Sequence, residues 1–241
     1  MKRPIRSARV GKMSDIIIRG STASEELNRL KGLVRKMPFF LEHGYKPTFP
    51  RSPLFRAVLD KDGNAKTWTV FAKVFETFLF RAADYARGLH VLESHGKEFQ
   101  NVLSRFVKWN RSWGFFLPPT YSIVLTRYGT GGSYNSGTGL ILLKANTRGE
   151  FKRENPMHTI VHEMVHVGIE EAIVQKFKLN HEEKERVVDL LCTIALKDIL
   201  DGYEIQRIGD TRIDAFFTKK TINNPVKAAQ KYHLATNKTR A

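Results

Sequence analysis

Five consecutive residues, His162-Glu163-Met164-Val165-His166, have the types and the spacing of a metal centre that could activate water. Residues four apart lie on one face of an α-helix, one turn above each other. Two imidazoles placed in this way can bind one Zn²⁺ at about 2.0–2.1 Å. Glu163, next to the first imidazole, can take a proton from water that the metal activates. The pattern therefore predicts a zinc ion held by His162 and His166, with Glu163 as a general base.

A catalytic zinc ion usually has three protein ligands and one open position, so a third ligand is needed. Glu170 lies on the same helix face, but it is eight residues from His162, or about 12 Å of helix rise, and one straight helix cannot bring both to one ion. The next predicted helix carries Glu185 and Asp189 one turn apart. Glu185 can be the third ligand, and Asp189 can accept the free N–H of a ligating imidazole. Both could instead be surface charges, because the segment around them is polar.

Two predicted helices position these side chains, over residues 156–177 and 180–200. The first follows an Asn-Pro pair, in which Asn155 can cap the helix and proline occupies the favoured first position. The second begins with Asn180 and Glu183, which have the spacing of a capping box. The break between the helices lets the second fold back antiparallel to the first, which would bring its carboxylates to the two histidines.

A small sheet is expected before the first of these helices. Residues 121–126 and 140–143 form apolar runs, and the first is rich in β-branched residues, which favour strands. The Gly-rich segment 129–139 would turn the chain between them, so that the two strands could pair antiparallel. This segment lacks the spacing of a phosphate-binding loop, and strand rather than helix follows it.

Apolar stripes at helical spacing predict two further helices, over residues 65–88 and 97–109. The four prolines of residues 37–56 predict irregular, extended chain there. Together the elements predict an α+β chain that is mostly helical, with a small antiparallel or mixed sheet preceding the motif helix.

Composition excludes several classes of protein. With 241 residues, 41% of them hydrophobic and 11% aromatic, the chain can bury a core and is not globally disordered. It has no apolar run of transmembrane length, so we expect no membrane partner. The single cysteine, Cys192, excludes an internal disulfide and a thiolate metal cluster, and its position on an apolar stripe predicts a buried side chain. We expect a cytoplasmic protein, while the basic N-terminus leaves organelle targeting open.

The net charge of +16 is concentrated at the two ends of the chain. Residues 1–60 hold thirteen basic and five acidic residues, and residues 218–241 hold six basic residues and no acidic one. Residues 1–24 and 218–241 also lack a sustained apolar period, which predicts a basic N-terminal arm and a basic C-terminal tail that pack little against the body. Such arms could bind nucleic acid or another polyanion, or could simply be solvated.

The motif H-E-x-x-H, followed 19 residues later by E-x-x-x-D, resembles the gluzincin metallopeptidases, the thermolysin-like branch of the zincins. The resemblance covers about residues 120–200. It implies that His162, His166 and Glu185 bind zinc, that Glu163 is the general base, and that Asp189 orients His162. It also implies a single zincin-like metallopeptidase domain, which we expect over residues 25–217, and a peptide or protein substrate.

In zincins an edge strand of the sheet pairs with the extended substrate, and residues 138–145 would be that strand here. The chain departs from the family in two respects. It is too short for the all-helical lobe that usually follows the third ligand. The downstream His or Tyr that acts on the tetrahedral intermediate has no clear match: Tyr203 and His233 are candidates by order alone, whereas Tyr128 and Tyr134 lie upstream.

Two other interpretations stay open. The chain could be a non-catalytic structural or binding protein with a zincin fold, whose zinc stiffens it and whose basic arms attach it to a nucleoprotein assembly. The motif could also be accidental in a helical protein. Metal content separates the last interpretation from the others, and the activity of a Glu163→Gln variant separates the first two. His158, one turn before His162, could line the site, although a hydrogen-bonded core histidine is the more common case.

Overall fold

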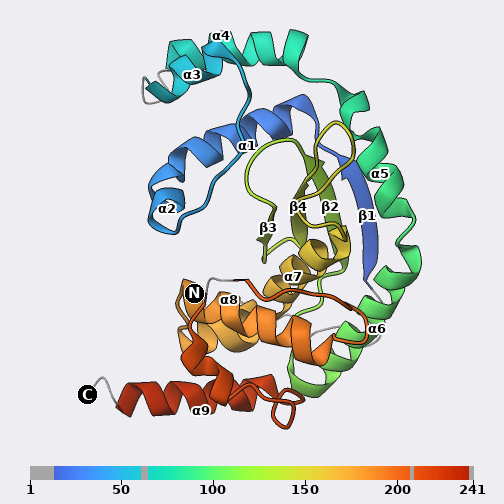
Figure 1. The fold of residues 1–241 in the computed structure, drawn as a ribbon, viewed down its shortest axis with the longest axis vertical. Helices are drawn as coiled ribbons and strands as arrows, with labels where there is room; N and C mark the ends of the chain where they lie inside the picture. The colour runs from blue at the N-terminus through green and yellow to red at the C-terminus, as the bar shows by residue number, and fades with distance from the viewer. Residues whose placement is uncertain (1–13, 61–64, 207–208, 239–241) are drawn as a thin grey trace, which may run out of the picture.

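The computed structural model describes residues 14–60, 65–206 and 209–238. Its sheet has the strand order β1-β2-β4-β3, with β1, β2 and β4 parallel and β3 antiparallel to β4 (Figure 1). The strands are β1 Asp15–Gly20, β2 Thr120–Thr126, β3 Gly132–Asn135 and β4 Leu140–Lys144. The predicted α+β class with a small mixed sheet is confirmed.

The predicted pairing within the sheet is wrong in one respect. The strands at residues 121–126 and 140–143 are neighbours, but they are parallel. The Gly-rich segment between them contains β3, which runs back antiparallel beside β4. β3 was not predicted because glycine disfavours strands locally, and only its pairing with β4 stabilises it. Residues 138–145 are therefore an inner strand, and the edge strands are β1 and β3.

Helices cover the sheet and extend beyond it on both sides (Figure 1). Residues 65–88 do not form one helix, because the chain is extended at Phe80 between α4 and α5. Residues 37–56, predicted as irregular, contain α2 and the start of α3. α7 and α8 each continue in one π-helical turn, Glu170–Gln175 and Leu191–Ala195. The α-helices are α1 Ala23–Arg35, α2 Met37–Glu42, α3 Pro53–Asp60, α4 Ala65–Val74, α5 Ala86–Glu93, α6 Gly96–Trp113, α7 Pro156–Ile169, α8 His181–Leu190 and α9 Pro225–Lys238.

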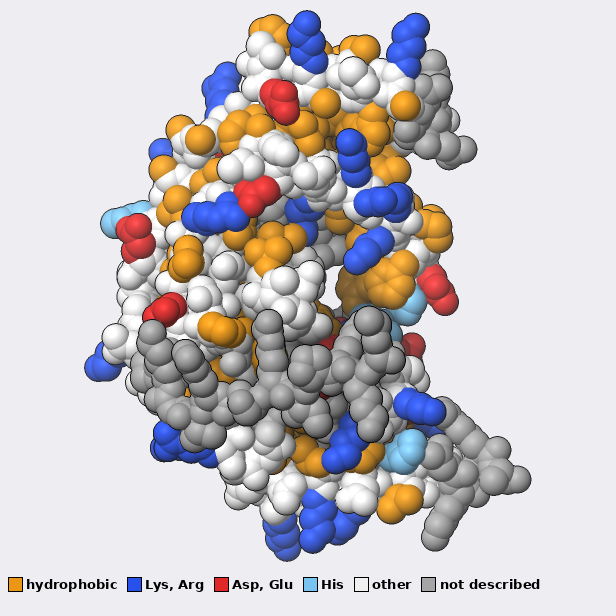
Figure 2. Space-filling model, turned by 180° about the vertical axis from the view of Figure 1, so that it is seen from behind, with side chains coloured by type: hydrophobic (Ala, Val, Ile, Leu, Met, Phe, Trp, Pro, Cys, Tyr) orange, Lys and Arg blue, Asp and Glu red, His pale blue; other side chains and the backbone are white. Residues whose placement is uncertain are grey.

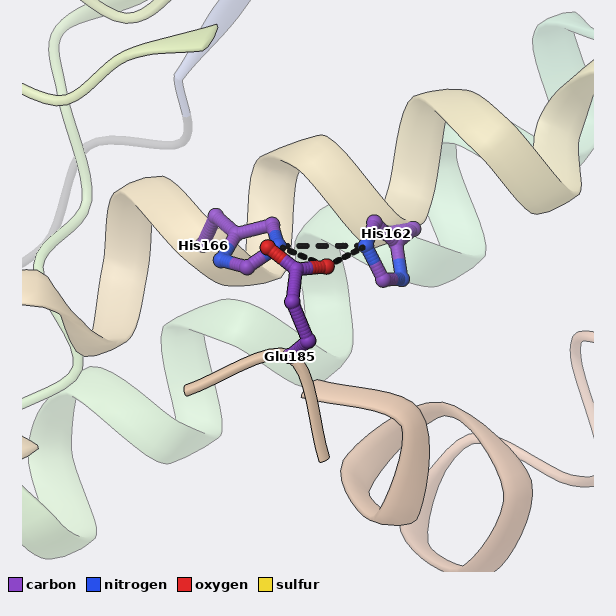
Figure 3. A group of neighbouring side chains, drawn as sticks. All are labelled: His162, His166 and Glu185. Atoms are coloured by element: carbon purple, nitrogen blue, oxygen red, sulfur yellow. Dashed lines mark hydrogen bonds and ion pairs between the residues drawn. The ribbon is translucent and has the colours of Figure 1, made fainter. Parts of the chain in front are cut away.

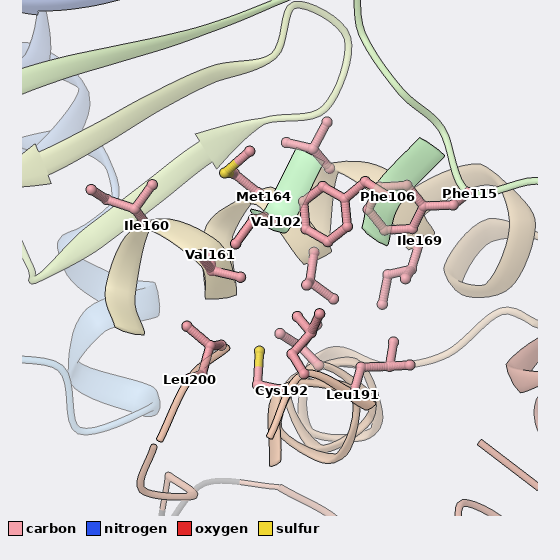
Figure 4. Packing of buried hydrophobic residues seen from close by; sticks show 14 of the residues in the cluster. Val102, Phe106, Phe115, Ile160, Val161, Met164, Ile169, Leu191, Cys192 and Leu200 are labelled. Atoms are coloured by element: carbon pink, nitrogen blue, oxygen red, sulfur yellow. The ribbon is translucent and has the colours of Figure 1, made fainter. Parts of the chain in front are cut away.

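The larger hydrophobic core lies between the sheet and α5–α9, and α7 runs through it. Ile160, Val161 and Met164 of α7 are fully buried, and Cys192 packs beneath them as predicted (Figure 4). α7 is apolar nearly all round, so its few polar side chains are held by packing on every side. This burial fixes the orientation of the histidines of the motif.

One glycine of α7 permits this packing. A Cβ atom at Gly168 would overlap the ring of Phe115, which is itself fully buried. We expect Gly168→Ala to destabilise the fold by about 1–3 kcal/mol, because the ring has no space to move into. Gly32→Ala is the matched control: it is also a helical glycine, but nothing lies within 4 Å of its added Cβ. That control should gain about 0.5–1 kcal/mol. Urea unfolding measures both, and equal midpoints would contradict the expected packing at Gly168.

A second, smaller core joins α1 to α4, and it includes Leu30, Phe55, Val58 and Phe71. Figure 1 shows that these helices lie on one side of the sheet. α2 reaches α8, because the rings of Phe39 and His181 are in contact, with centroids 5.4 Å apart. The two cores therefore build two walls, and the cavity described below lies between them.

The predicted loose packing of residues 1–24 and 218–241 is wrong wherever the structure describes these segments. β1 pairs with β2 along its whole length, and Ile16 and Ile18 pack on the larger core. In the tail, Ile222 and Tyr232 are buried, and the Tyr232 hydroxyl donates to Glu183 at 2.7 Å. Residues 1–13 and 239–241 lie outside the described part of the chain. Within the described part, no helix is long and apolar enough to cross a membrane.

Candidate metal centre

Three donor atoms converge between α7 and α8 (Figure 3). The Nε2 atoms of His162 and His166 are 3.1 Å apart, and Glu185 Oε2 lies 3.3 Å from the first and 3.4 Å from the second. All three side chains are buried, with exposed fractions of 5%, 1% and 7%. We call these three residues the donor group. Because buried polar side chains rarely converge without a shared partner, this arrangement could hold a metal ion.

The spacing of the donor group can be compared with that around zinc. Ligands at about 2.0–2.1 Å from a central ion, arranged as a tetrahedron, are about 3.3 Å apart. The three measured separations, 3.1, 3.3 and 3.4 Å, agree with this value. Two imidazoles and one carboxylate are also ligands that zinc accepts. The donor group therefore fits three corners of a tetrahedral site and leaves the fourth corner to another ligand.

The charges of the donor group depend on each other. Burial favours the neutral form of Glu185, but the two imidazoles outweigh it and hold the pKa of Glu185 well below its ordinary range. Burial lowers the pKa of His166 to about 4. A neutral imidazole and an ionised carboxylate are the forms that bind a metal, as for His166 and Glu185. Burial lowers the pKa of His162, but its contacts with Cys192 and Glu185 outweigh burial and raise it, so metal binding would displace a proton from this ring.

The other ring nitrogen of His162, Nδ1, contacts polar groups on the side of the ring away from the donor group. Its Nδ1 lies 2.7 Å from the Tyr203 hydroxyl and 3.5 Å from Asp189 Oδ1. The Tyr203 hydroxyl donates to the same Asp189 oxygen at 2.6 Å, and the backbone N–H of Gln206 donates to the other one at 2.8 Å. Asp189 is fully buried, and its carboxylate reaches the ring of His162 through the Tyr203 hydroxyl rather than by a hydrogen bond of its own. Tyr203 joins the two groups, a role that its place in the sequence did not indicate.

Removing the Tyr203 hydroxyl should weaken metal binding. We expect Tyr203→Phe to lower zinc affinity by about 10–100-fold, because the ring of His162 loses the partner that orients it. Tyr232→Phe is the control, since Tyr232 is also a buried tyrosine that donates to a carboxylate, but to Glu183, away from the centre. Competition with a zinc-binding dye measures both variants. Equal affinities in the two variants would show that Tyr203 does not support the centre.

His166 has a different environment from His162. Its ring stacks on Tyr134 of β3, with centroids 4.7 Å apart and planes 5° from parallel. Its Nδ1 is buried without a hydrogen-bond partner among the described residues. Stacking and burial, rather than a hydrogen bond, therefore hold this ring in place.

Glu163 lies beside the donor group, against β3. Its carboxylate is 8% exposed and packs so closely on Gly132 that a Cβ atom at that position would collide with it. Burial raises the pKa of Glu163 to about 7. The first strand residue of β3 must therefore be glycine for this carboxylate to occupy its place.

A cavity of about 890 Å³ reaches Glu163 and all three members of the donor group. It is lined by α1 and α2 on one side and by β3, α7 and α8 on the other, and Figure 2 shows the molecule hollowed near its middle. Ligand-binding pockets usually have volumes of about 300–1,000 Å³, so this cavity has the size of a ligand site. Sequence reasoning missed several lining residues from the first wall, among them Arg29 and Tyr45.

Two of the residues considered for acting on a reaction intermediate, Tyr203 and His233, lie outside the cavity. The Tyr203 hydroxyl lies behind His162, and the ring of His233 lies near Phe177, with centroids 6.0 Å apart. Neither residue lines the cavity. Tyr134 lines it, but its hydroxyl contacts Glu170 and Lys184.

Tyr45 also lines the cavity, and its hydroxyl lies 3.0 Å from Nε2 of His181. His181 is half-buried, and its Nδ1 is 3.7 Å from Glu185 Oε1. Tyr45 and His181 thus connect the first wall of the cavity to the donor group. His158 is a buried histidine whose Nε2 lies 3.0 Å from the carbonyl oxygen of Asp201, and it also lines the cavity.

Comparisons of the chain with protein-family models, with curated proteins and with solved structures found no match.

Proposed function

We propose that the protein is a zinc-dependent metallopeptidase with a zincin-like fold, of the gluzincin type. The single observation that carries the proposal is the donor group, whose three separations match those of zinc ligands and which borders a cavity. A structural zinc site is usually closed by four protein ligands, whereas a catalytic site keeps one position for water or substrate.

His162, His166 and Glu185 would hold the ion. When bound, zinc would polarise the peptide carbonyl group and acidify the attacking water. Glu163 takes the proton of that water as its oxygen bonds to the carbonyl carbon. Glu163 then gives the proton to the leaving nitrogen as the C–N bond breaks, which leaves a carboxylic acid and an amine. Asp189 and Tyr203 keep the ring of His162 in the orientation that binding requires.

β3 replaces residues 138–145 as the strand that would pair with the substrate. One side of β3 pairs with β4, and no described strand pairs with its other side. Glu163 lies against Gly132 at the start of β3, and Tyr134 of the same strand stacks on His166. An extended peptide added to this edge would place its backbone along the donor group.

The reaction is tested by incubating the zinc-loaded protein with an unbiased peptide mixture in ¹⁸O-labelled water. Hydrolysis should produce new peptide ends that carry one ¹⁸O in the new carboxyl group, and a chelator should abolish them. Intact peptides after prolonged incubation with zinc-loaded protein would contradict the proposal.

One observation favours the alternative, a non-catalytic zinc protein. The side-chain amide of Gln206 lies 3.0 Å from Nε2 of His162, where it could close the site as a fourth ligand. In that case Gln206→Ala would lose zinc, whereas a peptidase of the proposed type would retain it. The exposed Lys219, Lys220, Lys227 and Lys231 would then bind a polyanion, with an affinity that falls steeply as salt is added.

A further inference from the structure

Arg29 of α1 places a positive charge in the wall of the cavity, opposite α7 and α8. Its Nε donates to the carbonyl oxygen of Tyr128 at 2.8 Å, and its Nη1 donates to Ser133 Oγ at 3.1 Å. Nη2 has no hydrogen-bond partner in the part of the chain that the structure describes. Nor does any described carboxylate lie within 4.0 Å of this guanidinium. Arg29 is therefore held in a fixed orientation, with donors left over.

The space around these donors depends on a glycine. Gly129 has a φ of +100°, and a Cβ atom there would lie 2.6 Å from Arg29 Nη2. Any other residue would therefore be strained and would crowd the guanidinium. The Tyr128 carbonyl oxygen and the Ser133 hydroxyl occupy Nε and one N–H of Nη1. Nη2 and the second N–H of Nη1 stay available, and these two donors can bind a carboxylate in a bidentate manner.

Arg29 is close to the proposed reaction centre. Ser133, which it contacts, follows Gly132, and Gly132 lies against the carboxylate of Glu163. Burial lowers the pKa of Arg29, while the charges of Glu26 and Glu163 raise it. A strand advances about 3.3 Å per residue. A ligand on Arg29 would therefore lie within about two residues of a peptide bond held at Glu163.

The rest of the cavity also favours an anion. Glu25 is paired with Arg19 at 2.5 Å, and Glu163 and Glu185 belong to the metal centre, which leaves Glu170 as the remaining lining carboxylate. Four more lining cations form no ion pair with any described residue: Lys36, Lys152, Arg153 and Lys184. Figure 2 shows Lys and Arg side chains beside the hollow. Such a field raises the local concentration of acidic ligands.

We infer that Arg29 binds a carboxylate of the substrate within about two residues of the bond that is cleaved. This inference rests on the proposed peptidase function and names its substrate class: peptides with an acidic side chain at that position, or peptides that end there with a free C-terminal carboxylate. Both kinds of substrate present the same group to the same guanidinium.

Arg29 could instead have a purely structural role, because it lies near the buried carboxylate of Glu26. Glu26, one turn earlier, is fully buried and accepts hydrogen bonds from Tyr85, Thr126 and the backbone of Arg127. The charge of Arg29 stabilises this carboxylate. Loss of that stabilisation would lower the melting temperature, but it would not change the preference between an acidic and a neutral ligand. Ligand preference therefore separates the two roles.

The test uses zinc-loaded, full-length Glu163→Gln protein, in which binding is measured without turnover. Calorimetry compares peptide pairs that differ by Glu against Gln at each position, each with a free and an amidated C-terminus. We expect one carboxylate to tighten binding by about 10–100-fold, the range of hydrogen bonds to charged groups. Adding Arg29→Met should remove this preference and keep the zinc content. Adding Arg105→Met should keep both, because Arg105 holds a backbone carbonyl and Asp198 outside the cavity.

The peptide pairs distinguish the two sources of the carboxylate. A preference for Glu that survives amidation indicates an acidic side chain, and a preference that amidation abolishes indicates the C-terminus. Equal binding of all peptides, no binding up to millimolar concentration, or a preference that survives Arg29→Met would overturn the inference. Peptide cleavage by the unmutated enzyme without an acidic preference would overturn it while the peptidase proposal stands. If the protein binds acidic peptides preferentially but cleaves none, the peptidase proposal fails while the carboxylate site at Arg29 stands.

Discussion

Glu163→Gln should lower kcat/KM for peptide hydrolysis by about 10²–10⁴-fold, because glutamine cannot accept the proton of the attacking water. The zinc content should not change, since Glu163 is not in the donor group. Glutamine has nearly the same shape as glutamate, so it can occupy the space against Gly132. Initial rates on a peptide identified as a substrate, with zinc measured on the same samples, give both values.

Glu170→Gln is the control for this variant. Glu170 is also a carboxylate that lines the cavity, but it contacts Tyr134 and Gln175 instead of the donor group. Its loss should change kcat/KM by less than about tenfold, as for a group that does not take part in proton transfer. A Glu163→Gln enzyme as active as wild type would exclude Glu163 as the general base.

His166→Ala should lose zinc altogether under conditions in which the wild type holds one ion per chain. The expected loss in affinity exceeds the about 100-fold that removal of an outer hydrogen-bond partner causes, because a ligand atom itself is removed. Zinc at 100 times its Kd should stabilise the wild type by about 2.7 kcal/mol, and this gain should be absent from the variant. Elemental analysis and melting curves with and without zinc measure the two effects.

His158→Ala is the matched control for the histidine. His158 lies on α7, two turns before His166, and is also buried, but its ring contacts the carbonyl oxygen of Asp201. This variant should keep its zinc even if its melting temperature falls. A His166→Ala protein that keeps as much zinc as the wild type would place the metal elsewhere.

Local signals predicted the helices that carry the centre. Asn155 caps α7, and Asn180 and Glu183 form the expected capping box of α8. The four-residue spacing of the histidines fixes their common face before any tertiary contact forms. Because one straight helix cannot bring a third ligand to the same ion, the third donor was expected on the next helix. Glu185 lies there beside both imidazoles.

Two further local signals mark the starts of helices near the two ends of the chain. The Thr22–Glu25 pair forms a capping box at the start of α1, and the Asn-Pro pair before α9 matches the one before α7. The prediction of loosely packed ends rested on net charge and on the lack of a sustained apolar period, not on these caps. β1 is different, because its three isoleucines become a strand only through pairing with β2, about one hundred residues away.

The far wall of the cavity could not be predicted from the sequence. Arg29 and Tyr45 have no spacing relation to the motif, and the chain between them and α7 contributes residues to both cores. Their approach to β3 and α8 follows from how the two walls pack. Only a tertiary structure reveals that Tyr45 contacts His181 or that Arg29 contacts Ser133.

The central claim, that zinc at the donor group drives peptide hydrolysis, is tested most directly by titrating zinc into metal-free protein while peptide cleavage is followed by mass spectrometry. We predict that cleavage is absent without metal, rises linearly with added zinc and reaches a plateau at one ion per chain. Zinc that binds with this stoichiometry without producing cleavage, or cleavage that does not depend on zinc, would contradict the account.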